Sequence, residues 1–196
     1  MTNISINNVQ QLREKTGVGV MAAKKALEES GGDVEKAVTV LRKAGQKIAE
    51  KKQNRQTHEG VVGTYLHSNK KLLAAVAVAC ETDFVALTDP FQELAHDLAM
   101  HVAAMNPEYL GPENVPADLV NKEKEIAKAQ AISEGKSVKI IENIVSGKLN
   151  KFFEEKCLLK QKFFKDDEKT IEQVIQEAIQ KLGENIKIKE FIRFTI

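Results

Sequence analysis

The spacing of apolar residues changes near residue 60 of the chain. From residue 5 to residue 45, apolar side chains recur three and four positions apart, which is the period of an amphipathic helix. This segment predicts three short helices, the second from about Val20 to Glu29 and the third after an N-cap at Asp33. Each helix is expected to end at glycine, which closes helices in the left-handed conformation; the glycines are Gly17, the pair Gly31-Gly32 and Gly45.

Strand patterns follow this helical segment. Val61 to Leu66 and Leu72 to Cys80 are short apolar runs on either side of a turn signal at Ser68 to Lys70, and they predict a β-hairpin. The last segment alternates apolar and charged residues, which predicts a half-buried strand beside the hairpin and thus a three-stranded antiparallel sheet. One side of that strand is expected to carry Ile186, Ile188, Ile192, Phe194 and Ile196, and the other Lys187, Lys189 and Arg193.

Four helices are expected between the hairpin and the last strand. The first begins at Asp89-Pro90, and a loop from residue 106 to residue 116 follows it. The next two span residues 116–134 and 138–153, with Gly147 as a candidate break in the latter. The fourth carries the capping pair Thr170 and Gln173 and ends at Gly183. Helices packed on an antiparallel sheet predict an α+β fold.

The chain is expected to divide into two domains joined by a linker. Residues 1–45 would form the three-helix domain, and residues 60–196 the α+β core domain. Residues 46–59 are polar and lack an apolar stripe except for Ile48, which favours a solvated linker. The basic side chains of this linker are Lys47, Lys51, Lys52 and Arg55.

A candidate binding site follows the second predicted strand. Phe84 lies at the tip of the segment from Thr82 to Thr88, directly after Asp83 and before Val85. An acid beside a large aromatic residue on a short, tethered loop suits a side chain that wedges into a partner protein. The alternative, a turn aspartate and a core phenylalanine, fits the same residue types and stays open at this point.

Composition narrows the class of function. The 196 residues are 42% hydrophobic and 29% charged, with a net charge of +1 and interleaved acids and bases. A nucleic-acid surface needs clustered basic charge, so neither nucleic acid nor an anionic membrane is the expected partner. The start of the chain lacks the layout of a signal peptide, and no apolar run approaches the roughly 20 residues of a membrane span. The only cysteines, Cys80 and Cys157, form no CxxC motif, which indicates a reduced, cytoplasmic setting and two core residues.

Catalytic and metal-binding motifs are missing from the sequence. His96 and His101 are five residues apart, and no HExxH motif, metal-spaced Cys/His cluster or nucleotide-binding glycine loop occurs. The fragment Gly17-Val18-Gly19 joins two predicted helices instead of following a strand. The plentiful carboxylates fall on charged helix faces. We therefore expect no catalytic residue, no metal and no cofactor; the chain is predicted to be a binding protein and not an enzyme.

Four segments, taken in order, resemble the bacterial elongation factor Ts family and cover nearly the whole chain. The first runs from Leu12 to Met21 and continues as Lys24 to Leu27 and Gly31 to Asp33. The others are Cys80 to Ala86, Asn106 to Leu110 with Val115-Pro116, and Phe191 to Phe194. The resemblance implies an N-terminal three-helix domain like a ubiquitin-associated (UBA) module, followed by a core of antiparallel sheet and helices. Longer members carry two related core subdomains, whereas this chain has room for one, so a homodimer and a 2:2 complex are expected.

The same resemblance implies a guanine nucleotide exchange factor for elongation factor Tu in translation elongation. Phe84 would wedge between helices of the GTPase domain, and Asp83 would fix the loop or perturb polar contacts near the partner's Mg²⁺. Thr82 and Val85 would shape and support the loop, so that the ion is displaced indirectly and GDP leaves. On the three-helix domain, contacts near the nucleotide site would come from Arg13, Val20, Met21 and Lys24. Position 20 is often methionine in the family, and the smaller valine here implies a weaker contact.

Other functions fit parts of the sequence. The main alternative is a non-exchange interaction module, in which the three-helix domain binds a partner helix or peptide and the remaining chain is scaffold. An RNA-binding role would rest only on the basic linker. An enzyme is disfavoured because no catalytic constellation is present.

Overall fold

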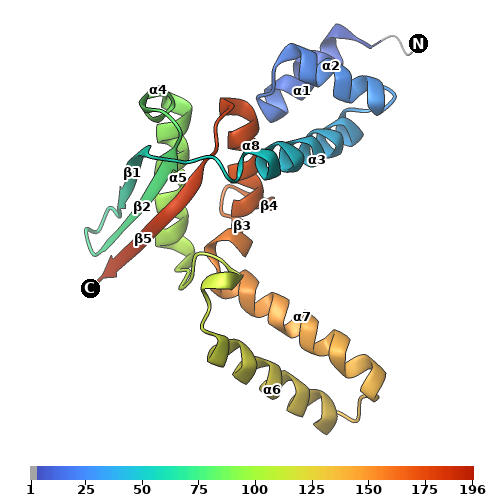
Figure 1. Cartoon of the computed structure of the whole chain (residues 1–196), viewed down its shortest axis with the longest axis vertical. Coiled ribbons are helices and arrows are strands. Elements are labelled where there is room, and N and C mark those ends of the chain that lie inside the picture. Colours follow the sequence, from blue (N-terminus) through green and yellow to red (C-terminus); the bar gives the residue numbers. More distant parts are fainter. Residues whose placement is uncertain (1–3) are drawn as a thin grey trace.

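The computed structural model describes residues 4–196, which fold into a helical N-terminal region and a core of sheet and helices (Figure 1). The N-terminal helices are α1 (Ile6–Thr16), α2 (Val20–Glu29) and α3 (Val34–Lys52). Gly17 closes α1 in the left-handed conformation, and the Asp33 carboxylate caps α3 by accepting from the backbone N–H of Lys36 at 3.0 Å. The core of this three-helix head is small and apolar: Leu12, Val18, Ala23, Ala26, Leu27, Ala37 and Leu41.

Helix α3 does not end at Gly45. Gly45 is buried where α3 packs on α8 (Ile171–Leu182), and the side chain of Gln180 on α8 lies beside it. Beyond it, Ile48 and Ala49 pack against the hydrophobic core formed by the sheet, α5 and α8. The predicted helix end is therefore wrong, and residues 46–52 are helical. The division of the chain into domains stays a prediction.

The main sheet has the predicted three antiparallel strands. Strands β1 (Glu59–Leu66), β2 (Leu72–Cys80) and β5 (Lys187–Thr195) lie in the order β1-β2-β5. Helix α5 (Asp89–Met105) packs on one face, and α8 joins the same core. A Cβ at Gly63 on β1 would overlap the carbonyl oxygen of Ala95, so glycine lets α5 approach the strand closely. The sheet thus has one face covered by helices.

The predicted alternation of β5 is broken by a bulge. Ala77 pairs with Glu190 and Val78 with Ile188, which leaves Lys189 as the extra residue. After the bulge, each side chain of β5 faces the side of the sheet opposite to the one predicted. The Arg193 side chain therefore reaches the helix side, where its Nε donates to the carbonyl oxygen of Ala103 at 3.1 Å. The prediction that Ile192, Phe194 and Ile196 share a buried side with Ile186 and Ile188 is therefore wrong, since only the last two are buried.

A helical hairpin extends from the core at the end opposite the head (Figure 1). It consists of α6 (Ala117–Ser133) and α7 (Val138–Lys156), and α7 continues through Gly147 without a break. The short elements α4 (Asp83–Ala86), η1 (Pro112–Asn114), η2 (Leu158–Lys160), β3 (Lys162–Phe163) and β4 (Asp166–Thr170) complete the fold. The capping box of Thr170 and Gln173 opens α8 as predicted. None of the helices described is long and apolar enough to span a bilayer.

A buried polar joint holds the base of the hairpin. The side chain of Gln161 donates from Nε2 to the carbonyl oxygen of Glu155 at 2.8 Å, so its Oε1 faces Nε2 of His101 at 3.0 Å. Because that oxygen can only accept, Nε2 carries the imidazole proton. Nδ1 is buried without a partner among the described residues. Burial lowers the pKa of His101, and the bond to Gln161 opposes this only in part.

Candidate functional site

The segment predicted as a loop contains one turn of helix. Thr82 is the N-cap of α4: its hydroxyl accepts a hydrogen bond from the backbone N–H of Val85 at 3.4 Å. Ala86 is buried and Val85 packs against the main core, which fixes the inner side of the turn. Phe84 points the other way, with 80% of its surface exposed. The structure thus places this aromatic ring outside the core, and the alternative of a core phenylalanine is excluded.

The neighbours of Phe84 extend this exposed tip. Asp83 is exposed in the first turn of α4, and Leu87, just beyond its end, is 70% exposed. Leu87 was not among the predicted site residues, although its place on a short helical turn could have suggested it. An acid, an aromatic ring and a leucine on a turn anchored from beneath form a surface suited to insertion into a protein partner.

The turn is also fixed from the far end of the chain. The carboxylate of Glu184 accepts hydrogen bonds from the backbone N–H groups of Glu81 and Thr82, both at 3.0 Å, and from the Thr82 hydroxyl at 2.6 Å. Beside them, the buried Cys80 thiol donates to the carbonyl oxygen of Thr82 at 3.1 Å. Burial, and next the charge of Glu184, raise the pKa of this thiol. Cys157 is likewise free and buried, so both cysteines are core residues as predicted.

The predicted contact residues of the head lie where α1 ends and α2 begins. Met21 is 77% exposed and Val20 about half exposed, while Lys24 forms a long ion pair with Glu28 on the same helix at 4.0 Å. Arg13 donates from Nε to the carbonyl oxygen of Val18 at 3.4 Å, which holds its side chain against the turn between the helices. A shallow hollow beside them is lined by Ile6, Val9, Gln10, Arg13, Glu14 and Val20. Of these, Ile6 is exposed and was not predicted.

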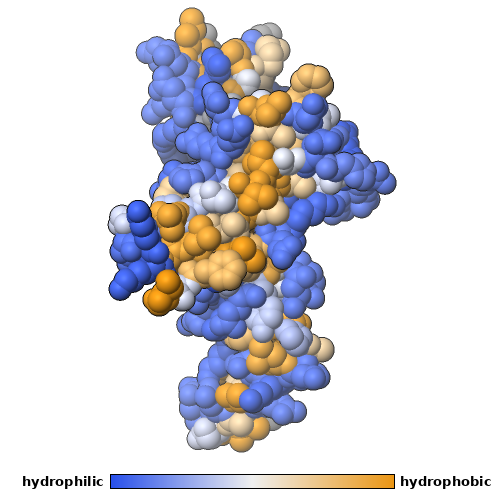
Figure 2. Space-filling view, turned by 90° about the vertical axis from the view of Figure 1, so that its left-hand side faces the viewer, coloured by the Kyte–Doolittle hydropathy of each residue, from blue (hydrophilic) through white to orange (hydrophobic). Residues whose placement is uncertain are grey.

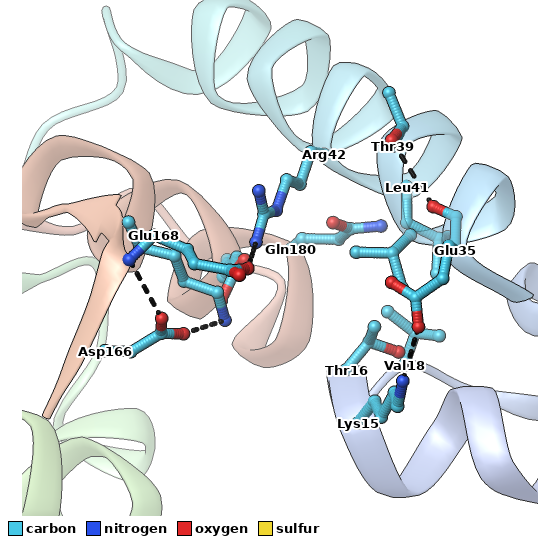
Figure 3. Close-up of a pocket in the computed structure, with 13 residues that line it drawn as sticks. Lys15, Thr16, Val18, Glu35, Thr39, Leu41, Arg42, Asp166, Glu168 and Gln180 are labelled. Carbon is cyan, nitrogen blue, oxygen red and sulfur yellow. Dashed lines mark hydrogen bonds and ion pairs between the residues drawn. The ribbon is translucent and has the colours of Figure 1, made fainter.

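Both candidate regions lie in the same half of the elongated molecule, away from the hairpin (Figure 1). A polar pocket lies between the head and the core, lined by residues of α1, α3, β4 and α8 (Figure 3). Arg42 on α3 faces Glu168 on β4 at 3.9 Å, and Lys15 pairs with Glu35 at 2.6 Å within the head. In addition, the Lys52 ammonium at the end of α3 donates to the carbonyl oxygen of Gly183 after α8. The head is therefore held against the core at several points along α3.

The outer face of the sheet is apolar and exposed. The bulge in β5 turns Ile192 and Phe194 onto this face, where they lie opposite Ala75 and Leu73 of β2. On β1, at the other side of β2, Val62 and Leu66 are exposed on the same face. Figure 2, which shows this side of the molecule, has its broadest apolar area over the sheet. An exposed apolar patch of this kind is typical of an interaction surface.

Within residues 4–196, no three His, Cys, Asp or Glu side chains are grouped in a way that could hold a metal ion. The fold and the site define an α+β protein whose candidate contact residues are displayed on exposed helices and turns. A family model described as "Elongation factor TS" matches residues 4–196, so the chain belongs to the elongation factor Ts family and is a translation elongation factor.

Relatives along the full length of the chain agree with this assignment. The elongation factor Ts of Thermosipho melanesiensis is 53% identical over 193 residues, covering 98% of each chain. Those of Syntrophomonas wolfei and Pseudothermotoga lettingae are each 50% identical over 193 residues, or 98% of this chain, and the alignments cover 90% and 98% of the relatives' lengths.

Proposed function

We propose that this protein is a guanine nucleotide exchange factor for elongation factor Tu, acting in the cytoplasm. It would bind the complex of Tu with GDP, displace Mg²⁺ indirectly, and promote GDP release so that GTP can bind. The observation that carries this proposal is the exposed ring of Phe84 on a turn anchored to the core from beneath. No bond is made or broken in this activity, so the protein acts by binding and not as an enzyme.

The proposed mechanism is mechanical and electrostatic. Bound guanine nucleotide is held largely through its phosphates, by a glycine-rich loop and a magnesium ion that neutralises their charge. Phe84 inserted between helices of the GTPase domain would shift the elements that hold the ion. Asp83 beside it would perturb polar contacts near the metal. Once Mg²⁺ is displaced, the charge of the phosphates would no longer be neutralised by the ion, so GDP would be held more weakly and would dissociate.

Thermodynamic linkage makes the exchange reversible. A factor that binds the nucleotide-free partner more tightly must lower that partner's affinity for nucleotide, and nucleotide lowers the affinity for the factor by the same ratio. GTP entering the emptied site therefore expels the factor. The head would add affinity through Arg13, Val20, Met21 and Lys24, and its attachment along α3 keeps it at a set position relative to Phe84.

We further propose that two copies pair through the outer face of the sheet and act as a 2:2 complex with Tu. Phe194 and Val62 present apolar side chains from the two outer strands, 59% and 64% exposed, with alanines of β2 between them. Facing sheets of this kind can pack into a two-layer sandwich. Lys70 and Lys71, at the hairpin turn, would lie on the polar, solvent-exposed rim of this interface.

A test of exchange activity is the release of fluorescent GDP from Tu, followed by stopped flow. Substoichiometric amounts of the protein should accelerate release, because each molecule is expelled by incoming nucleotide and acts again. The alternative of a non-exchange interaction module predicts binding to Tu or another partner with an unchanged release rate. Since α3 packs on α8, deletion of residues 1–45 would expose the core, and point variants of the head are the cleaner comparison.

A further inference from the structure

Two carboxylates tie the segment before Phe84 to the segment before β5 in a reciprocal manner. Glu184 accepts from the backbone N–H groups of Glu81 and Thr82. In return, Oε1 of Glu81 accepts from the backbone N–H of Asn185 at 2.7 Å. Each carboxylate thus binds the main chain of the opposite segment, more than 100 residues away in sequence. We call these residues, Glu81, Thr82, Glu184 and Asn185, the carboxylate clasp.

A third segment joins the clasp. The side chain of Asn185 is buried and donates from Nδ2 to the carbonyl oxygen of Arg55 at 2.8 Å. The Arg55 guanidinium lies 3.4 Å from Oε1 of Glu81 and offsets part of the negative charge. Residues 53–58 connect α3 with β1, so the clasp joins the end of the head's last helix to the base of the Phe84 turn.

The Phe84 turn depends on such support because it is too short to be stable alone. Helix α4 has four residues, and an isolated helix of this length does not form in water. The Thr82 hydroxyl has a double role: it accepts from the Val85 N–H as N-cap and donates to Oε1 of Glu184. Loss of the carboxylate would leave this cap without its orienting acceptor and would free the backbone at Glu81 and Thr82.

We propose that Glu184 is a positioning residue for nucleotide exchange: through the carboxylate clasp it holds the α4 turn in the orientation that presents Phe84 to the partner. This inference rests on the proposed exchange function. Glu184 need not touch the partner, because its carboxylate is directed at the backbone of the protein's own turn.

The first experiment needs no partner. Amide hydrogen exchange measured by NMR should show that the N–H groups of Glu81 and Thr82 exchange faster in Glu184→Ala than in wild type. Glu184→Gln keeps one carbonyl acceptor and should give an intermediate rate. Glu177→Ala is the matched control: Glu177 is a carboxylate on α8 paired with Lys169 at 2.9 Å, outside the clasp. Unchanged exchange at both amides in Glu184→Ala, or in Glu184→Gln if the alanine variant does not fold, would overturn the proposal.

The second experiment measures GDP release from Tu at saturating factor. Loss of hydrogen bonds to a charged group should slow release by roughly tenfold in Glu184→Ala and less in Glu184→Gln, with Glu177→Ala at the wild-type rate. In a Phe84→Ala background, Glu184→Ala should add little, since both act through the same ring. An equal loss in both backgrounds would show that Glu184 does not act through Phe84. If the wild-type protein does not accelerate GDP release from Tu, the proposed exchange function is wrong. The amide measurement still decides whether the clasp holds the turn.

Discussion

Phe84 and Phe91 are seven residues apart, yet one lies at the surface and the other in the core: the ring of Phe84 is 80% exposed, whereas that of Phe91, on α5, is fully buried. The same type of side chain therefore lies at the surface in one position and in the core in the other. This pair provides a variant and a matched control for separating function from folding.

We predict that Phe84→Ala slows GDP release from Tu by roughly thirtyfold, the effect of losing an aromatic hot spot of about 2 kcal/mol. Its melting temperature should stay near the wild-type value because the ring makes few contacts within the protein. Phe91→Ala should instead lower the unfolding free energy by about 3–5 kcal/mol. Stopped-flow fluorescence and thermal unfolding measure the two effects. A destabilised Phe84→Ala variant with wild-type release would contradict the assignment.

Asp83→Ala should have a smaller effect than loss of the ring. We expect release of labelled GDP to slow by around tenfold, or about 1.4 kcal/mol, because the carboxylate assists the wedge without supplying its apolar area. Asp89→Ala is the control, since Asp89 is an exposed aspartate at the start of the next helix. Equal release rates for the two variants would remove Asp83 from the site.

A glycine variant on β1 tests the packing of α5 on the sheet, and a glycine variant on α7 serves as its comparison. Gly63→Ala should destabilise the protein by 1–3 kcal/mol or more, about the cost of overpacking, because the new methyl group would overlap the carbonyl oxygen of Ala95. Gly147→Ala, in the middle of α7 with no atom near the new methyl group, should stabilise by roughly 0.5–1 kcal/mol. Urea unfolding of both variants gives the comparison. A Gly63→Ala variant as stable as wild type would show that the close approach at Gly63 is not tight.

Acid should weaken the joint at the base of the hairpin. Burial places the pKa of His101 below its ordinary value of about 6.5, so the unfolded chain takes up a proton that the fold resists. The contribution of neutral His101 to the free energy of unfolding is fully present above about pH 6.5. It is lost as the pH falls from there toward the lower pKa of His101 in the folded state. Urea unfolding between about pH 5 and pH 7.5 should show a steeper acid loss in wild type than in His101→Gln. The control variant His58→Gln, at an exposed position, should keep the wild-type slope.

The outer sheet face predicts self-association. Wild type should have the mass of a dimer at micromolar concentration and dissociate on dilution, as measured by light scattering across a dilution series. Phe194→Lys should shift the protein to monomer, since a charge on the apolar face cannot be solvated in a sandwich. Ile132→Lys, at an exposed apolar position on the hairpin, should leave the mass unchanged. A monomeric wild type at micromolar concentration would contradict pairing.

Sequence alone predicted the elements whose limits are set locally. Helix α2 has the predicted bounds, and the caps at Gly17, Asp33 and Thr170 are where the residue types placed them, because a cap involves only nearby backbone. Gly45 was misleading because α3 continues past it along α8, which is remote in sequence. The parity of β5 was missed for a similar reason, as the bulge is defined only by its pairing with β2.

The candidate site was predictable in part. The residues from Thr82 to Val85 were singled out by type and order, but their chemistry left the exposure of Phe84 open. That exposure follows from which side of α4 Ala86 and Val85 anchor, and no local pattern encodes it. Glu184 carried no signal at all, because a carboxylate after a helix is ordinary until the backbone it binds is known.

Helix α3 contributes Ala37 and Leu41 to the head and Ile48 and Ala49 to the main core, so a single rigid rod belongs to both. Each residue of an α-helix adds about 1.5 Å of length and 100° of rotation. Removing one residue between Leu41 and Ile48 would rotate the head relative to the core by about 100° around the axis of α3. Met21 would then face a different direction, although every side chain of the head remained intact. In this segment the number of residues, more than their identity, therefore sets the orientation of the head relative to the core.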